Sequence, residues 1–258
     1  MDVNLDQYCF PISERNIAVD DFANDIVDWG NEHTYLPTQD YKAIVRGDTN
    51  ELISIVRSSY KVIPNALIIN KLLQFLASTG ENFRIDSSHS FVQNSRMRLQ
   101  VTFPELVLED SESDINLSLF VENSYNMSTG LKYYFGAIRM ICQNGLILGQ
   151  ILSQYYAKYT KGFEMSDFSA SLEQARAHMP TIQQRVNQLE ALPANKQLVE
   201  QVEEKISKRL AEEVLDEMQE KRLSQWELLN KITHYISHDL DPHLRARHQR
   251  TVSRIFEL

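Results

Sequence analysis

The chain has 258 residues and a mass of 29.9 kDa, enough for one large domain or two small ones. Hydrophobic residues make up 43% and charged residues 24%, typical of a soluble globular chain that buries a core. The net charge of -9 argues against a protein that binds nucleic acid through overall basicity. However, residues 1–30 and 164–242 each carry -6, residues 31–163 are neutral, and residues 243–258 carry +3. The neutral centre leaves room for a local cationic site.

The sequence predicts a cytoplasmic location and no membrane segment. The two cysteines, Cys9 and Cys142, are too few for a disulfide framework. The start of the chain, Met1–Asp6, has two acids and lacks the cationic region of a secretory signal. Polar residues interrupt the most apolar stretch, Ile138–Leu152, before it reaches the length of a membrane span.

The N-terminal part is predicted to hold a short acidic helix and then a β-hairpin. Asp20–Asn31 has an apolar side that suits a helix. Tyr41–Arg46 and Glu51–Arg57 are rich in β-forming residues, and Gly47–Asn50 between them is a strong turn sequence.

A helix is predicted after this hairpin. The short strand Tyr60–Ile63 is expected to stop at Pro64. Asn65 can then cap a helix that runs to about Ser78 and ends at Gly80.

A second strand-rich block is predicted from Phe83 to Cys142. Within it, Arg96–Phe103 alternates with a period of two, which is typical of a half-buried strand. The apolar face holds Met97, Leu99, Val101 and Phe103, and the polar face holds Arg96, Arg98, Gln100 and Thr102. After a polar turn at Glu109–Asp114, Ile115–Val121 alternates again, and Leu131–Cys142 is apolar on both faces, as in a central strand.

From Gly145 onward the apolar residues have helical spacing. Four helices are predicted: Leu146–Tyr159, Ser169–Leu192, Asn195–Glu220 and Ser224–Leu240. The sequence therefore predicts an α+β fold, with an N-terminal antiparallel β-sheet and a packed helix followed by a mostly helical C-terminal region. We expect a strand-rich core at 1–163 and a helical region at 164–258 that packs on or extends it, with a basic tail at 243–254.

Three short stretches resemble a known family. Asn123–Asn126 comes before a strand that ends with Arg139, Cys142 and Asn144. Ser58–Asn65 and Trp226–His238 agree with two further stretches of the same pattern. Together they resemble the phage- and plasmid-borne family described as domain of unknown function 932, over roughly residues 40–240.

The resemblance implies an origin in a phage or other mobile element. By analogy of fold, it also implies a similarity to phage single-strand annealing proteins. The chain departs from the family pattern at Tyr125, Asn126 and Met127, where His, Asp and Gly are usual. If the family uses that His–Asp pair for chemistry, this chain has lost it, so the departures argue against an enzyme.

One group of residues is a candidate site for single-stranded nucleic acid. Such a site needs cations that follow the phosphates and aromatic rings on which bases stack. The candidates are Arg57, Arg96, Arg98, Lys132 and Tyr134, with Arg139 and Tyr133 nearby. The alternative is a solvated strand face on which the arginines pair with Glu105 or Glu122.

The residues of the family motif are interpreted as structural, namely Asn123, Ser124, Arg139, Cys142 and Asn144. Cys142 lacks a neighbouring His to activate it, so we expect a small buried residue and not a nucleophile. A buried Arg139 needs a partner such as a carboxylate or backbone carbonyls.

No metal or cofactor is expected. His234 and His238 have metal-compatible spacing, but the apolar residues around them place both toward solvent. The sequence lacks the glycine-rich motifs that cradle nucleotides.

Two functions follow from these patterns. The first is a non-enzymatic, oligomeric protein that binds or anneals single-stranded nucleic acid through Arg96 and Arg98. The second is a factor that binds a host protein through the acidic flanks and the Asn195–Glu220 helix. The basic tail has two interpretations: it binds phosphates, or it contacts the acidic segment 1–30 of the same or a neighbouring subunit. A contact between subunits predicts a head-to-tail homo-oligomer.

Overall fold

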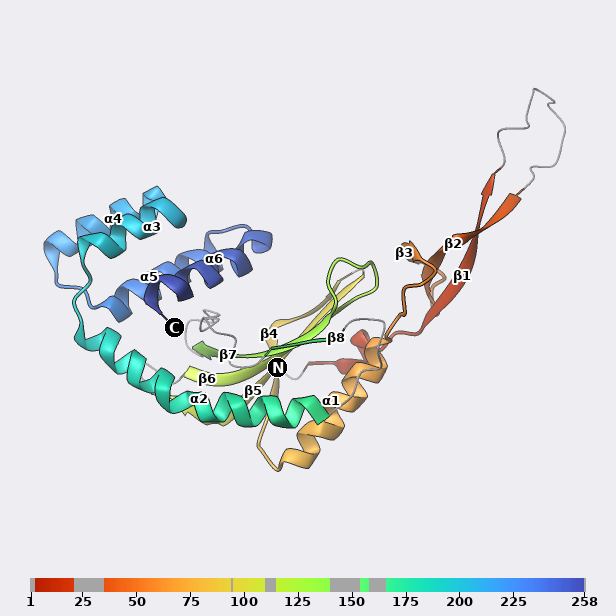
Figure 1. Cartoon of the computed structure of the whole chain (residues 1–258), viewed down its shortest axis with the longest axis horizontal. Coiled ribbons are helices and arrows are strands. Elements are labelled where there is room, and N and C mark those ends of the chain that lie inside the picture. Colours follow the sequence, from red (N-terminus) through yellow and green to blue (C-terminus); the bar gives the residue numbers. More distant parts are fainter. Residues whose placement is uncertain are drawn as a thin grey trace, which may run out of the picture.

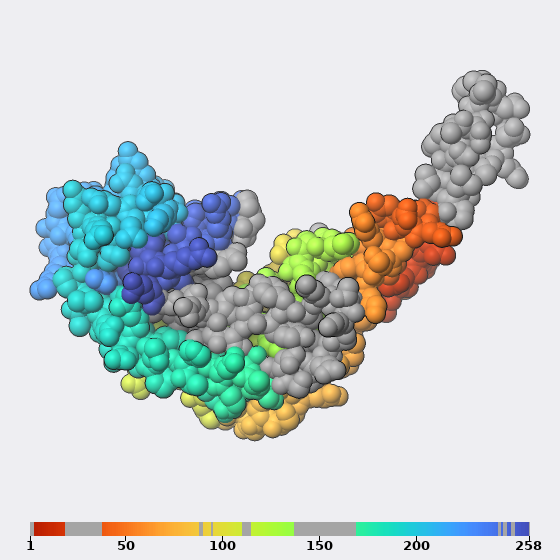
Figure 2. Space-filling model, viewed as in Figure 1, coloured from red at the N-terminus to blue at the C-terminus, as the bar shows by residue number. Residues whose placement is uncertain are grey.

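The computed structural model describes residues 3–20, 35–93, 95–109, 115–139, 154–157 and 166–257. These residues form a small sheet, a large sheet with helices along one face, and a cluster of helices (Figure 1). The small sheet and the helical cluster lie at opposite ends of the large sheet (Figures 1 and 2). The predicted α+β class is confirmed.

The small sheet contains three antiparallel strands in the order β1–β2–β3, after a short 3-10 helix at Leu5–Tyr8. The strands are β1 (Ile12–Asp20), β2 (Tyr35–Arg46) and β3 (Leu52–Arg57). The predicted hairpin is therefore confirmed, and Asn50 in its turn has a φ of 60°. Strand β1 was not predicted, and the predicted Asp20–Asn31 helix lies almost entirely outside the described residues, with Asp20 ending β1.

Helix α1 (Asn65–Thr79) connects the small sheet to the large one. It ends at Gly80, whose φ of 70° is in the left-handed region that glycine favours. The prediction of a strand at Tyr60–Ile63 is wrong, because this segment has no regular secondary structure. Instead, the N–H of Tyr60 donates to the C=O of Arg57 at 2.9 Å, so the chain turns away from the sheet.

The large sheet has five antiparallel strands in the order β4–β5–β6–β7–β8. They are β4 (Arg84–Gln93), β5 (Arg96–Leu108), β6 (Ile115–Ser124), β7 (Leu131–Arg139) and β8 (Gln154–Ala157). Met97, Leu99, Val101 and Phe103 are buried against α1 and α2, which confirms the predicted apolar face of β5. The predicted helix Leu146–Tyr159 is wrong at 154–157, because that segment pairs with β7, and the rest of it lies outside the described residues.

The C-terminal region holds five helices. They are α2 (Ser166–Ala191), α3 (Lys196–Lys205), α4 (Lys208–Glu220), α5 (Gln225–His238) and α6 (Pro242–Phe256). The single predicted helix Asn195–Glu220 is two helices, because Ser207 caps the start of α4 by accepting the N–H of Leu210. The basic tail at 243–254 lies in α6.

Helix α2 joins the two larger parts of the molecule. Its Leu172 and Ala175 pack with the large sheet, whereas its Val186 and Leu189 belong to the core of the helical cluster. Leu108 of β5 also contacts that second core, so the helices pack on one end of the sheet (Figure 1). Among the described helices, none is long and apolar enough to cross a membrane.

Candidate nucleic-acid interface

The large sheet has one apolar and one polar face. Because side chains alternate along a strand, the residues between those of the apolar face point away from α1 and α2. We call this second side the polar sheet face. The strand pairing arranges it in rows: Phe91, Arg98, Glu122 and Lys132 in the first; Asp86, Gln100, Phe120 and Tyr134 in the second; Arg84, Thr102, Ser118 and Gly136 in the third.

Glu122 is the centre of the charged first row. Its carboxylate forms an ion pair with the ammonium of Lys132 at 2.8 Å and accepts a hydrogen bond from the hydroxyl of Tyr134 at 3.0 Å. The Nε atom of Arg98 lies 3.6 Å from the same carboxylate. Burial opposes the ionisation of Glu122, but the charges of Arg98 and Lys132 outweigh it and hold the pKa below its usual value. The predicted alternative, in which an arginine pairs with Glu122, is therefore present at Arg98.

Tyr134 is part of this cluster and is buried. Only 6% of its surface is exposed, its ring stacks on Phe120 with centroids 5.1 Å apart, and its hydroxyl accepts the Nη2 of Arg98 at 2.9 Å. Burial raises the pKa of Tyr134 above its usual value. Such a ring has little free surface for a base, and Tyr133 is buried on the opposite face. Neither tyrosine is placed as a stacking platform.

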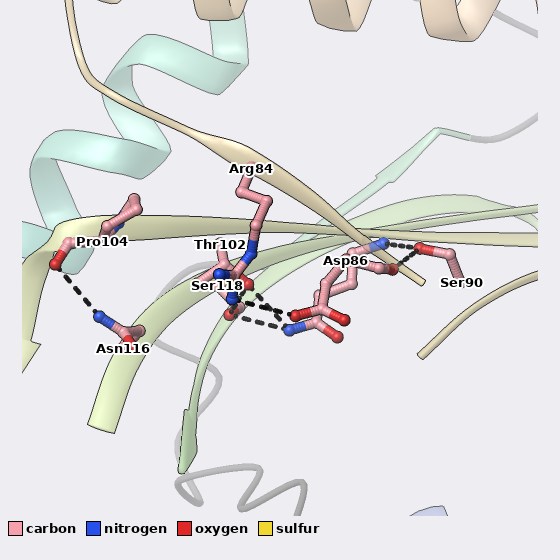
Figure 3. A network of polar contacts seen from close by, with 8 residues as sticks. Arg84, Asp86, Ser90, Thr102, Pro104, Asn116 and Ser118 are labelled. Atoms are coloured by element: carbon pink, nitrogen blue, oxygen red, sulfur yellow. Dashed lines mark hydrogen bonds and ion pairs between the residues drawn. The ribbon is translucent and has the colours of Figure 1, made fainter. Parts of the chain in front are cut away.

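The second and third rows hold a hydrogen-bond network, shown in Figure 3, which includes an ion pair between Arg84 and Asp86 at 3.3 Å. The amide of Gln100 donates to the hydroxyls of Thr102 at 3.0 Å and Ser118 at 3.3 Å. All three side chains are buried, although the sequence placed Gln100 and Thr102 on a solvated face. Among the residues that the structure describes, the buried Oε1 atom of Gln100 meets no hydrogen-bond donor.

The exposed end of the polar sheet face is formed by Arg96 and Phe91. Arg96 is exposed and makes no ion pair with any described residue. Phe91 of β4 pairs with Arg98, and 40% of its surface is exposed. An accessible aromatic ring thus lies on the same face as two arginines. The sequence interpretation missed Phe91, although the Asn-Ser turn before Arg96 predicts a hairpin that pairs these strands.

Arg57 is not part of the polar sheet face. It lies on β3 in the small sheet, where it pairs with Tyr41 of β2. Of the five predicted nucleic-acid residues, the structure therefore brings together Arg96, Arg98, Lys132 and Tyr134.

The motif residues Asn123 and Ser124 lie where the small sheet, α1 and β6 meet. Asn123 is fully buried, and its amide donates to the side chain of Asn65 at 2.8 Å and to the C=O of Ile63 at 3.0 Å. The hydroxyl of Ser124 donates to the C=O of Thr129 at 2.7 Å. Both side chains thus hold backbone segments in place.

Tyr125, at the position of the family histidine, completes this junction. Its buried hydroxyl accepts the N–H of Asn65 at 2.8 Å, and its C=O accepts the hydroxyl of Ser54 at 2.6 Å. The hydroxyl of Tyr60 donates to the C=O of Ser124 at 2.7 Å. The two resembling stretches Ser58–Asn65 and Asn123–Asn126 are therefore in contact. Arg139 ends β7, and Cys142 and Asn144 lie outside the described residues.

The two histidines of α5 are exposed, as their positions predicted. Their rings lie 4.4 Å apart at the C-terminal end of the helix. Within the described parts of the chain, no three His, Cys, Asp or Glu side chains gather where they can hold a metal ion.

The chain matches the family model for the Domain of unknown function (DUF932) over residues 52–257. The match begins at the first residue of β3 and includes the polar sheet face, the junction and the helical cluster. Neither a curated protein nor a solved structure matches the chain. The analogy with single-strand annealing proteins accordingly stays a prediction.

Proposed function

The chain belongs to the DUF932 family, and we propose that this member is a non-enzymatic, self-associating protein that binds single-stranded nucleic acid on its polar sheet face. The observation that carries the proposal is the exposed ring of Phe91 beside Arg96 and Arg98. Aromatic rings with neighbouring cations are the combination that single-strand binding requires, because every base has a face that can stack.

The charges of the first row also favour an anionic ligand. Arg98 and Lys132 share the single carboxylate of Glu122, so this group keeps one net positive charge. Arg96, two residues before Arg98 on the same strand face, adds a second positive charge. A local positive surface of this kind attracts phosphates even though the whole chain is acidic.

The alternative function, binding of a host protein through Asn195–Glu220, has less support. That segment is two helices, and several of its charges pair within the helices. The pairs are Lys196–Glu200, Lys208–Glu212 and Arg209–Glu213. Less of this charge is left to recognise a partner.

The test is fluorescence anisotropy with labelled single-stranded DNA over a salt series. We expect binding that weakens steeply as the salt concentration rises, since phosphate contacts release counterions. Phe91→Ala should weaken binding by about 1–3 kcal/mol, the usual contribution of one stacked base. The double variant Arg96→Ala/Arg98→Ala should weaken it further and reduce the salt dependence.

Two control variants remove the same kinds of side chain away from the site. Phe83→Ala removes a similarly exposed aromatic ring just before the other end of β4, and Arg222→Ala removes an exposed cation between α4 and α5. Both should bind like the wild type. Failure to bind at low salt, or equal effects of the site and control variants, would overturn the proposal.

A further inference from the structure

Strand β3 is an open edge of the small sheet. The sheet order β1–β2–β3 gives β3 one partner, β2, among the described strands. The N–H of Ser58 donates to the C=O of Asp40 at 2.9 Å, and hydrogen-bonded pairs alternate along antiparallel strands. Ala43 and Ile55 are therefore a non-hydrogen-bonded pair, which turns the N–H and C=O of Ile55 outward. The backbone of β3 can accept a further strand.

The side chains of β3 do not protect this edge. Natural edge strands are usually blocked by proline, by lysine or by an inward-pointing charge. The sequence of β3, Leu-Ile-Ser-Ile-Val-Arg, has none of these within the strand. Leu52 is 55% and Ile55 is 58% exposed, and Tyr41 on the neighbouring β2 is 46% exposed. These are three of the large apolar side chains that remain accessible, and they lie together on two paired strands.

The charges at the two ends of β3 indicate what covers this edge. Glu51 precedes the strand and Arg57 ends it, and both are exposed. Neither makes an ion pair with any residue that the structure describes. When such a strand pairs antiparallel with a copy of itself, the acidic end of one copy meets the basic end of the other, twice. The edge is therefore complementary in charge to itself.

We propose that β3 pairs antiparallel with β3 of a second copy, forming a two-fold symmetric dimer through a continuous six-stranded sheet. This inference deepens the self-association within the proposed function and is independent of nucleic-acid binding. The small sheet projects from the rest of the molecule, so the edge is accessible to another chain (Figure 2). The contact differs from the head-to-tail arrangement predicted from the charges of the chain ends.

The test is sedimentation and light scattering of the full chain over a wide range of concentration. The wild type should reach twice the chain mass of 29.9 kDa. Ile55→Lys should raise the dissociation constant by about tenfold or more, because a charge on the edge opposes strand addition. Leu192→Lys, which changes a comparably exposed residue at the end of α2, is the control and should dimerise like the wild type.

Charge exchange provides a second test. Glu51→Arg alone and Arg57→Glu alone each place like charges opposite one another and should weaken the dimer. The double variant restores opposite charges and should recover most of the affinity. Circular dichroism of each variant verifies that it folds.

Three results would refute the dimer. They are a single-chain mass at every concentration, association unaffected by Ile55→Lys, and failure of the double variant to recover. An assembly that is larger than a dimer and has the same mass in the wild type and in these variants would favour the head-to-tail contact. A stable dimer without DNA binding would overturn only the binding proposal, and DNA binding by a monomer would overturn only the dimer.

Discussion

Replacing Glu122 with glutamine should destabilise the fold while strengthening nucleic-acid binding. The side chain of Glu122 is 13% exposed, pairs with the charges of Lys132 and Arg98, and accepts a hydrogen bond from Tyr134. A hydrogen bond to a charged group contributes about 1.5–3 kcal/mol. Arg98 and Lys132 each remain 25% exposed, so water recovers part of the loss. We expect Glu122→Gln to lower the free energy of unfolding by about 1.5–3 kcal/mol.

The same variant should change the dependence of stability on pH. The pKa of Glu122 is lower in the folded chain than its usual value, so the unfolded chain binds the additional proton. The contribution of Glu122 is therefore complete above the unfolded pKa of about 4.3 and is lost as the pH falls through the folded pKa. Urea unfolding from neutral to acidic pH should show that loss in the wild type, and the difference from Glu122→Gln should shrink as the pH falls.

Binding should respond in the opposite direction, because the variant frees both cations from their carboxylate. The affinity for single-stranded DNA should rise, and the salt dependence should steepen by about 0.7 for each additional phosphate contact. Glu105→Gln, which changes an exposed carboxylate on the neighbouring strand β5, is the control. If Glu122→Gln is as stable as the wild type at neutral pH and binds no tighter, the reasoning about this cluster is refuted.

Three further changes test the junction and the helix ends by urea unfolding. Tyr125→Phe removes an acceptor from the buried N–H of Asn65 and should cost about 1–3 kcal/mol; an unchanged midpoint would contradict this role. Gly80→Ala should cost about 1–2 kcal/mol, since φ is 70° and the new methyl group meets no neighbouring atom; Gly80→Asn should lose less, and equal losses would argue against backbone strain. Ser224→Ala removes the capping box with Glu227 and should cost about 1 kcal/mol, which a stability equal to that of the wild type would disprove.

Hydrophobic periodicity predicted which side of a strand faces the helices, but it did not predict how deeply the opposite side is buried. It identified the buried face of β5 residue by residue, because one side of that strand packs on helices. It also placed Gln100 on the opposite side, but alternation does not tell how deeply that second side is buried. The hydrogen bonds of Gln100 include one to Ser118 on the neighbouring strand β6, which the alternation within β5 does not reveal.

The errors in the helical half have a similar origin. The apolar stripe from Leu198 to Met218 keeps its spacing across the break at Ser207, so periodicity alone indicates one helix. The hydroxyl of Ser207 caps a new helix at that point, and the two helices pack on each other. At 154–157, pairing with β7 overrides the local helical spacing, as sheet contacts often do.

The candidate site was predicted in part. The cations on β5 followed from alternation, and Glu122 was one of two expected carboxylate partners for the arginines. Phe91 was missed because β4 departs from regular pairing between Asp86 and Phe91, which obscures its period. Tyr134 was misjudged because the residues that cover its ring come from other strands.

The junction around Tyr125 has a consequence for the order of folding. Helix α1 begins after Pro64, whose side chain does not cap it. The first N–H of the helix, that of Asn65, instead donates to the hydroxyl of Tyr125, 60 positions later in the chain. The N–H of Asn65 therefore gains this acceptor only when Tyr125, which follows β6, reaches the junction. The start of this helix and the attachment of the small sheet form and open as one cooperative unit, which hydrogen exchange at Asn65 would report together with that at Tyr125.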